Sequence, residues 1–115
     1  MEDNLINILE SFNLPVMRQG SLAPDETYPA AFFTFWNNSE DGQSFYDNET
    51  ATVVYDYAVN VYSTDPDQVY DLLKQARREL KTRGWIIYRR GYDIASDEIT
   101  HVGRGMEVIF LKNEF

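Results

Sequence analysis

The chain contains no cysteine and only one histidine, His101. Without thiols it cannot form disulfides, thiolate zinc sites or a cysteine nucleophile. A single imidazole cannot build a histidine metal cluster, so His101 is expected to be a solvated or strand-face residue rather than a lone base. No segment approaches the length of apolar sequence that a membrane span requires, and the acidic N-terminus does not resemble a secretory signal. We therefore expect a soluble protein that is made in the cytoplasm and has no membrane partner.

Motifs that carry chemistry are also missing. Asp93, Asp97 and Glu98 could offer oxygen ligands to a hard cation, but their spacing lacks the alternating ligands and central glycine of a calcium loop, so a solvated turn is expected. The GRG at 103–105 is too short for a phosphate-binding loop and is more typical of a bulge in a strand. The sequence thus predicts no catalytic residue, no metal site and no cofactor, and it argues against an enzyme.

The composition predicts a folded chain. Of the 115 residues, 43% are hydrophobic and 15% are aromatic, which exceeds what disordered chains contain. This length suits one domain, spanning 1–115, with a single two-layer core. The eight tyrosines favour surfaces that are buried against partners.

Hydrophobic periodicity in the first half predicts a short helix followed by two strands. The helix covers 3–12, and an irregular connection with several prolines covers 14–29. A strand at 30–38 places Phe32 and Trp36 on one face and Phe33 and Phe35 on the other. The acidic segment 39–49 is expected to be an exposed excursion. The second strand, 50–62, alternates most cleanly, with the following residues on one face: Val53, Tyr55, Tyr57, Val59 and Val61.

The clearest helix signal lies at 66–83. Asp65 suits the N-cap position, Pro66 the first turn, and Gln68 a capping box, while Gly84 suits the position after the C-terminus. Strands at 85–90 and 101–112 follow. The predicted order is α-β-β-α-β-β, an α+β fold with an antiparallel or mixed sheet of about four strands and two helices packed on one face.

Positive charge is scarce and concentrated. The chain carries a net charge of -9, yet residues 74–90 hold seven of its ten basic residues and only one acidic residue, Glu79. Sequence-specific nucleic-acid binding is disfavoured because the rest of the chain repels phosphate. For single residues, a solvated helix face with pairs such as Glu79 and Arg83 is a sufficient explanation. As a pattern, the segregation favours contact between copies arranged head to tail, which can close into a ring.

In the order of its elements and in its residue pattern the chain resembles the tail-terminator, or tail-completion, proteins of long-tailed bacteriophages. The resemblance covers nearly the whole chain and includes YPAAFFTFWNN, TATVVYDYAVNVYS, DPDQVYDLLKQARRELKTRGW and RRGYDIASDEITHVGRGMEVIFL. It rests on no catalytic signature. It implies a virion structural protein that forms a hexameric ring on the head-proximal end of the tail tube. The ring ends tube polymerisation and offers the surface for head attachment.

The partners implied by this resemblance are other copies of the chain, the tail-tube protein and a head-closure or neck protein, with DNA passing through the lumen without specific binding. We further hypothesise that charged and aromatic residues form the subunit interface. The cations are Arg77, Arg78, Arg83, Arg89 and Arg90, and they face an acidic set drawn from Glu40, Asp41, Asp47 and Glu49. Phe33 and Phe35 supply apolar contact in this hypothesis, although an ordinary place in the core explains them equally well.

Two other functions remain open at this point. A head-closure, neck or other minor tail protein would share the same residue pattern and element order. A small acidic inhibitor or DNA mimic is permitted by the net charge, but the compact basic segment and the aromatic content argue against it.

Overall fold

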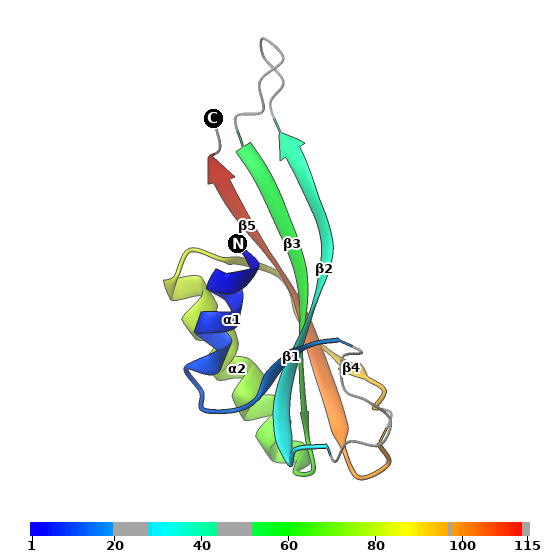
Figure 1. The fold of residues 1–115 in the computed structure, drawn as a ribbon. Coiled ribbons are helices and arrows are strands. Elements are labelled where there is room, and N and C mark those ends of the chain that lie inside the picture. Colours follow the sequence, from blue (N-terminus) through cyan, green and yellow to red (C-terminus); the bar gives the residue numbers. More distant parts are fainter. Residues whose placement is uncertain (20–27, 44–51, 97, 114–115) are drawn as a thin grey trace.

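The computed structural model describes residues 1–19, 28–43, 52–96 and 98–113. It is an α+β fold in which two helices pack against one mixed sheet (Figure 1). The helices are α1 (Glu2–Glu10) and α2 (Pro66–Thr82). The strands are β1 (Val16–Arg18), β2 (Ala31–Gln43), β3 (Thr52–Ser63), β4 (Ile86–Ile94) and β5 (Val102–Asn113).

The sheet has five strands in the order β1-β2-β3-β5-β4. β1 runs parallel to β2, and the other neighbours are antiparallel. The predicted fold class is confirmed, but the number of strands and the element order are corrected. The strand that the sequence did not predict is β1, which lies in the segment expected to be irregular. Its three residues are too few to show a period, and only pairing with Phe33–Phe35 of β2 makes them a strand.

Both helices cover the same face of the sheet. The alternation predicted for β3 is confirmed for Tyr57, Val59 and Val61, which are at most 1% exposed. They pack against the apolar stripe of α2 and the buried side of α1. That core contains Leu5, Ile8, Leu9, Phe33, Phe35, Val69, Leu73, Ala76, Leu80, Trp85, Met106 and Val108. We call the helix-covered side of the sheet the core face and the other side the open face.

The strands are longer than the sequence suggested. β2 continues to Gln43, so the first part of the predicted acidic excursion is strand, and β4 continues to Ile94. Pairing with the neighbouring strands extends them: β2 follows β3 past an irregularity between Asn37 and Ser39. As a result, β2, β3 and β5 extend past the helices in Figure 1.

α2 begins and ends where its capping residues predict. The Asp65 carboxylate accepts a hydrogen bond from the backbone N–H of Asp67 at 3.0 Å, and Gly84 adopts a φ of +94°. The predicted capping box is modified: the Gln68 amide oxygen accepts from the Ser63 hydroxyl, which in turn accepts from the N–H of Asp65. The end of β3 is thereby joined to the first turn of α2. Among the described residues, no helix has the length and apolarity needed to cross a bilayer.

Replacing Asp65 with alanine should lower the free energy of unfolding by about 1 kcal/mol, because the first turn of α2 loses its side-chain acceptor. Urea denaturation followed by circular dichroism measures this loss. Thr64→Ala is the matched control, since the neighbouring threonine is exposed and its described hydrogen bond comes from the backbone. Equal stability of the two variants would show that the Asp65 cap contributes nothing.

Candidate subunit interface

A cationic groove lies between α2 and β4. It has a volume of about 190 Å³ and is lined by Lys74, Arg77, Arg78, Lys81 and Arg90. No carboxylate of the described residues lines it. The four helix residues follow one another at intervals of three, one and three, so α2 presents them on one side. We call these five residues the basic groove.

Arg77 is the most constrained member of the basic groove. Its guanidinium donates a 2.9 Å hydrogen bond to the backbone carbonyl of Arg90, which fixes α2 to β4. Burial, followed by the nearby charges of Arg90 and Arg104, lowers the pKa of Arg77 below its ordinary value. Like charges are therefore held together here at a cost to the folded chain. An anion entering the groove would relieve that repulsion.

The structure brings together three of the five arginines predicted for the interface. Arg77, Arg78 and Arg90 line the basic groove, whereas Arg83 and Arg89 have partners within the chain. Arg83 pairs with Glu79 at 3.0 Å, as expected for residues four apart on a helix. Arg89 pairs at 3.1 Å with Glu107 on the neighbouring strand β5, and its guanidinium lies 4.1 Å from the ring centre of Tyr92.

Sequence reasoning missed Lys74 and Lys81. The signal was present, because Lys74, Arg77, Arg78 and Lys81 are spaced as one stripe of a helix. Arg83 falls on another side of α2, and the same periodicity could have separated it from the set. The contribution of Arg90 could not be found in this way, since it depends on β4 lying beside α2.

Of the predicted acidic set, Glu40 is the member whose side chain the structure describes. It is exposed on β2 and accepts a 2.8 Å hydrogen bond from the Asn37 amide. Asp41 belongs to β2 through its backbone pairing with Val54, but its side chain lies outside the described part. Asp47 and Glu49 also lie outside the described residues.

Phe33 and Phe35 are 0% and 4% exposed and belong to the core of the chain itself. Of the two interpretations, contact at the subunit interface and an ordinary place in the core, this burial agrees with the second. They point to the helix-covered side because β2 alternates, and that side is already filled by α1 and α2. Apolar contact with a partner therefore requires other residues.

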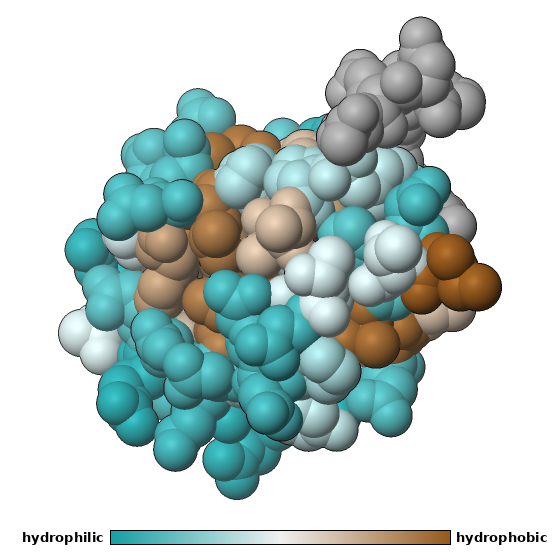
Figure 2. All heavy atoms as spheres, turned by 90° about the horizontal axis from the view of Figure 1, so that it is seen from below, coloured by the Kyte–Doolittle hydropathy of each residue, from teal (hydrophilic) through white to brown (hydrophobic). Residues whose placement is uncertain are grey.

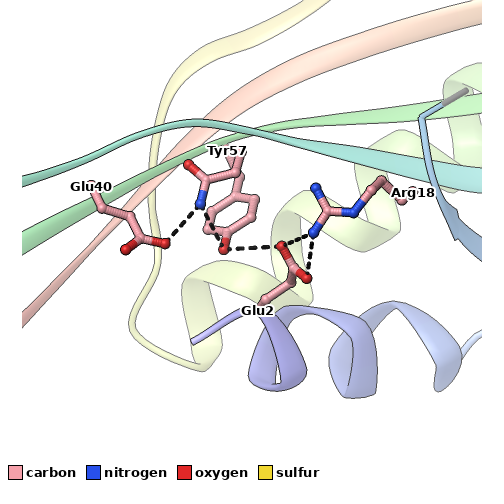
Figure 3. Close-up of polar contacts among 5 residues, drawn as sticks. Glu2, Arg18, Glu40 and Tyr57 are labelled. Carbon is pink, nitrogen blue, oxygen red and sulfur yellow. Dashed lines mark hydrogen bonds and ion pairs between the residues drawn. The ribbon is translucent and has the colours of Figure 1, made fainter.

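Glu40 stands at one end of a polar chain above the core (Figure 3). The Asn37 amide donates to Glu40 and, at 3.4 Å, to the Tyr57 hydroxyl. That hydroxyl donates to Glu2 of α1 at 3.5 Å, and Arg18 of β1 binds both oxygens of Glu2 at 2.7 Å. These contacts connect α1, β1, β2 and β3, and they hold Glu40 at the surface.

The remaining candidates for chemistry are occupied by structural contacts. His101 is 8% exposed and lies one residue before β5. Of the two expectations, a solvated or a strand-face histidine, the first is therefore wrong. The Nε2 of His101 donates to the carbonyl of Pro29 at 2.7 Å, because a carbonyl can only accept, and its Nδ1 is hydrogen-bonded to the Thr100 hydroxyl at 2.9 Å. Asp93 pairs with Arg104 at 2.7 Å. Asp97 lies outside the described residues, and the described ones contain no group of ligands suited to a metal.

A larger hollow of about 350 Å³ lies beside the start of α2, with Arg104 in its wall. Arg104 is already satisfied, by Asp93 and by the ring of Tyr70, whose centre lies 4.4 Å from the guanidinium carbon. Figure 2 views this end of the molecule, and hydrophobic side chains reach the surface there in separate places among hydrophilic ones. The guanidinium in the wall of this hollow is therefore already paired, and the apolar surface visible in Figure 2 is interrupted by hydrophilic residues.

The comparisons with known proteins identify no family for this chain. No family model matches the chain, and no curated protein matches it significantly.

Arg78→Gln should raise the free energy of unfolding of the monomer by about 0.2 to 0.5 kcal/mol at low salt, because it removes one cation from a like-charged stripe. Arg83 is paired with Glu79, so Arg83→Gln should instead lower the free energy of unfolding slightly. Urea denaturation at low and high salt tests both changes, since salt screens the repulsion. A loss of stability in Arg78→Gln would contradict the repulsion described here.

Tyr57 generates a second prediction. Burial, then the charges of Glu2 and Glu40, raises the pKa of Tyr57 from 10.0 to about 12. Between these values the unfolded phenol loses its proton while the folded one keeps it, so stability falls as pH rises. Tyr57→Phe lacks this ionisation.

From pH 9 to 11.5 the free energy of unfolding of the wild type should therefore fall by about 1 to 3 kcal/mol more than that of Tyr57→Phe. Denaturant titration at the two pH values gives the difference directly, with the same comparison at pH 7 and 9 as the control. Parallel losses in the two proteins would contradict the raised pKa.

Proposed function

We propose that this chain is a structural protein of a long-tailed bacteriophage, acting as a tail terminator. Copies assemble head to tail into a ring, most simply a hexamer, on the head-proximal end of the tail tube. The ring ends tube polymerisation and presents the surface to which the head attaches. The protein acts in the virion and is assembled in the host cytoplasm. Its partners are other copies of itself, the tail-tube protein and a head-closure protein.

The observation that carries this proposal is the position of opposite charges at the two opposite edges of one sheet. The basic groove borders β4, which is one edge strand, and its lining, as far as the structure describes it, contains no carboxylate. Glu40 lies on β2 beyond the part that β1 covers, and among the described strands β2 forms the opposite edge there. A surface that complements a different surface of an identical copy makes a heterologous contact, and such contacts generate rings or filaments.

The charges supply specificity more than affinity. Exposed ion pairs contribute about 0 to 1 kcal/mol each, so they select the partner and its orientation while apolar contacts provide most of the binding energy. The net charge of -9 adds a second effect, because it repels DNA at long range. Repulsion of this kind suits a ring through which a duplex passes without being held.

Adding the purified protein to polymerising tail-tube subunits tests the proposal. We expect tubes of limited length with an annular particle at one end in electron micrographs, because a terminator blocks addition of further subunits. A hexamer of this 13.4-kDa chain would weigh about 80 kDa by native mass spectrometry.

A head-closure or neck protein is the competing assignment, and it should leave tube growth unchanged. Unrestricted tubes without annular ends, at protein in excess over tube ends, would exclude the terminator function. Tight binding of the assembled ring to duplex DNA at low salt would contradict the passive lumen.

A further inference from the structure

We propose that two copies of the chain join edge to edge, with β4 of one copy beside the outer edge of β2 in the next, and that Trp36 is the apolar anchor of this joint. The inference rests on the proposed head-to-tail assembly and names the residues that make the contact. In this proposal Trp36, and not Phe33 or Phe35, supplies the apolar contact between copies.

Trp36 is the largest apolar side chain exposed at the β2 edge. It is 50% exposed, and it lies on the open face because its neighbour Phe35 lies in the core. In the described part of the chain, β1 pairs with β2 only along Phe33–Phe35, and this pairing ends just before Trp36. A half-exposed tryptophan at a strand edge is the type of residue that dominates binding energy in protein interfaces.

The β4 edge offers a matching apolar surface on the same side. Ile86 and Tyr88 are 47% and 46% exposed. Ile86 pairs with Ile109, which lies between core residues of β5 and therefore points to the open face. The Tyr88 hydroxyl donates to Asp56 of β3 at 2.7 Å, which places its ring over the open face as well. Tyr88 is thus held in position for contact rather than free to rotate.

The opposite charges also match in layer. Glu40 pairs in register with Tyr55, two residues before the buried Tyr57, so it lies on the core face of β2. The basic groove lies between β4 and α2, and α2 covers the core face of the sheet. If two copies meet with their layers aligned by a simple displacement, β4 of one copy runs antiparallel to β2 of the next. With Trp36 beside Ile86 and Tyr88, Glu40 then reaches past the beginning of β4. Lys81 of the basic groove lies at that end, because its carbonyl accepts a hydrogen bond from the N–H of Gly84 just before β4. One displacement therefore satisfies the apolar contact and an ionic contact between Glu40 and Lys81.

Irregularities in both edges indicate that side chains, not a continuous backbone ladder, make the joint. β2 has a register shift between Asn37 and Ser39, and β4 has shifts on both sides of Arg89. The carbonyl of Arg90 is also occupied by Arg77. Bulges and charges of this kind prevent indiscriminate pairing of sheet edges. The joint would then be selective for the copy whose charges and apolar residues match.

The first arm of the test measures self-association by analytical ultracentrifugation, alone and with tail tubes, after circular dichroism has shown that each variant is folded. Trp36→Ser should raise the protein concentration needed for assembly at least tenfold. Ile99→Ser is the matched control, because Ile99 is fully exposed in the connection between β4 and β5 and should have no effect. Assembly of Trp36→Ser at wild-type concentration would overturn the proposal.

The second arm uses charge reversal, which does not depend on Trp36. Glu40→Lys and Lys81→Glu should each weaken assembly, and the double variant should recover most of the loss because the opposite charges meet again. Additive losses in the double variant would overturn the pairing. A photo-cross-linking residue at Trp36 should attach to residues 86–90 of another copy, and attachment to the tube protein alone would likewise overturn it.

These outcomes separate the joint from the function. If the variants behave as expected but the wild type does not limit tube length, the joint stands and the terminator function fails. If tubes are limited equally by the wild type and by Trp36→Ser, the function stands and the joint fails. A wild-type chain that stays monomeric with and without tubes excludes the joint.

Discussion

Burial of one face of β3 is the constraint on which the rest of the structure depends. β3 is the only strand of the described sheet that pairs along its whole length on both sides, with β2 and with β5. Its residues Tyr57, Val59 and Val61 contact both helices through the core. Because side chains alternate along a strand, this burial also decides what the open face of the sheet contains. The surfaces available to partners are a consequence of how the core is filled.

The asymmetry between the two faces explains why aromatic residues have different roles. Phe33 and Phe35 are covered by helices, whereas Trp36, one position further along, remains half exposed. Phe32 is covered in another way, by stacking on Tyr62 at 5.1 Å between ring centres and by lying near His101. A high aromatic content therefore serves both the core and the surface of this small domain, and position in the alternation separates the two uses.

Charge is distributed by the same geometry. α2 needs one apolar stripe for the core, so its cations are free to gather on the side that faces β4. Cross-strand and helical partners neutralise Arg83 and Arg89, while the basic groove keeps a surplus. On the opposite edge, the chain from Arg18 through Glu2, Tyr57 and Asn37 holds Glu40 in place (Figure 3). The proposed assembly uses charges that folding leaves uncompensated.

The sequence by itself determined the elements whose signals are local. Capping residues placed α2, alternation placed the buried face of β3, and residue spacing paired Glu79 with Arg83, since each depends on residues a few positions apart. Only the tertiary structure decided the features that depend on distant partners. β1 is a strand because β2 lies beside it, Phe33 and Phe35 are core because two helices cover them, and Arg90 joins the cations of α2 because β4 packs next to that helix. Long-range packing, which no local pattern encodes, selects which exposed groups share an edge.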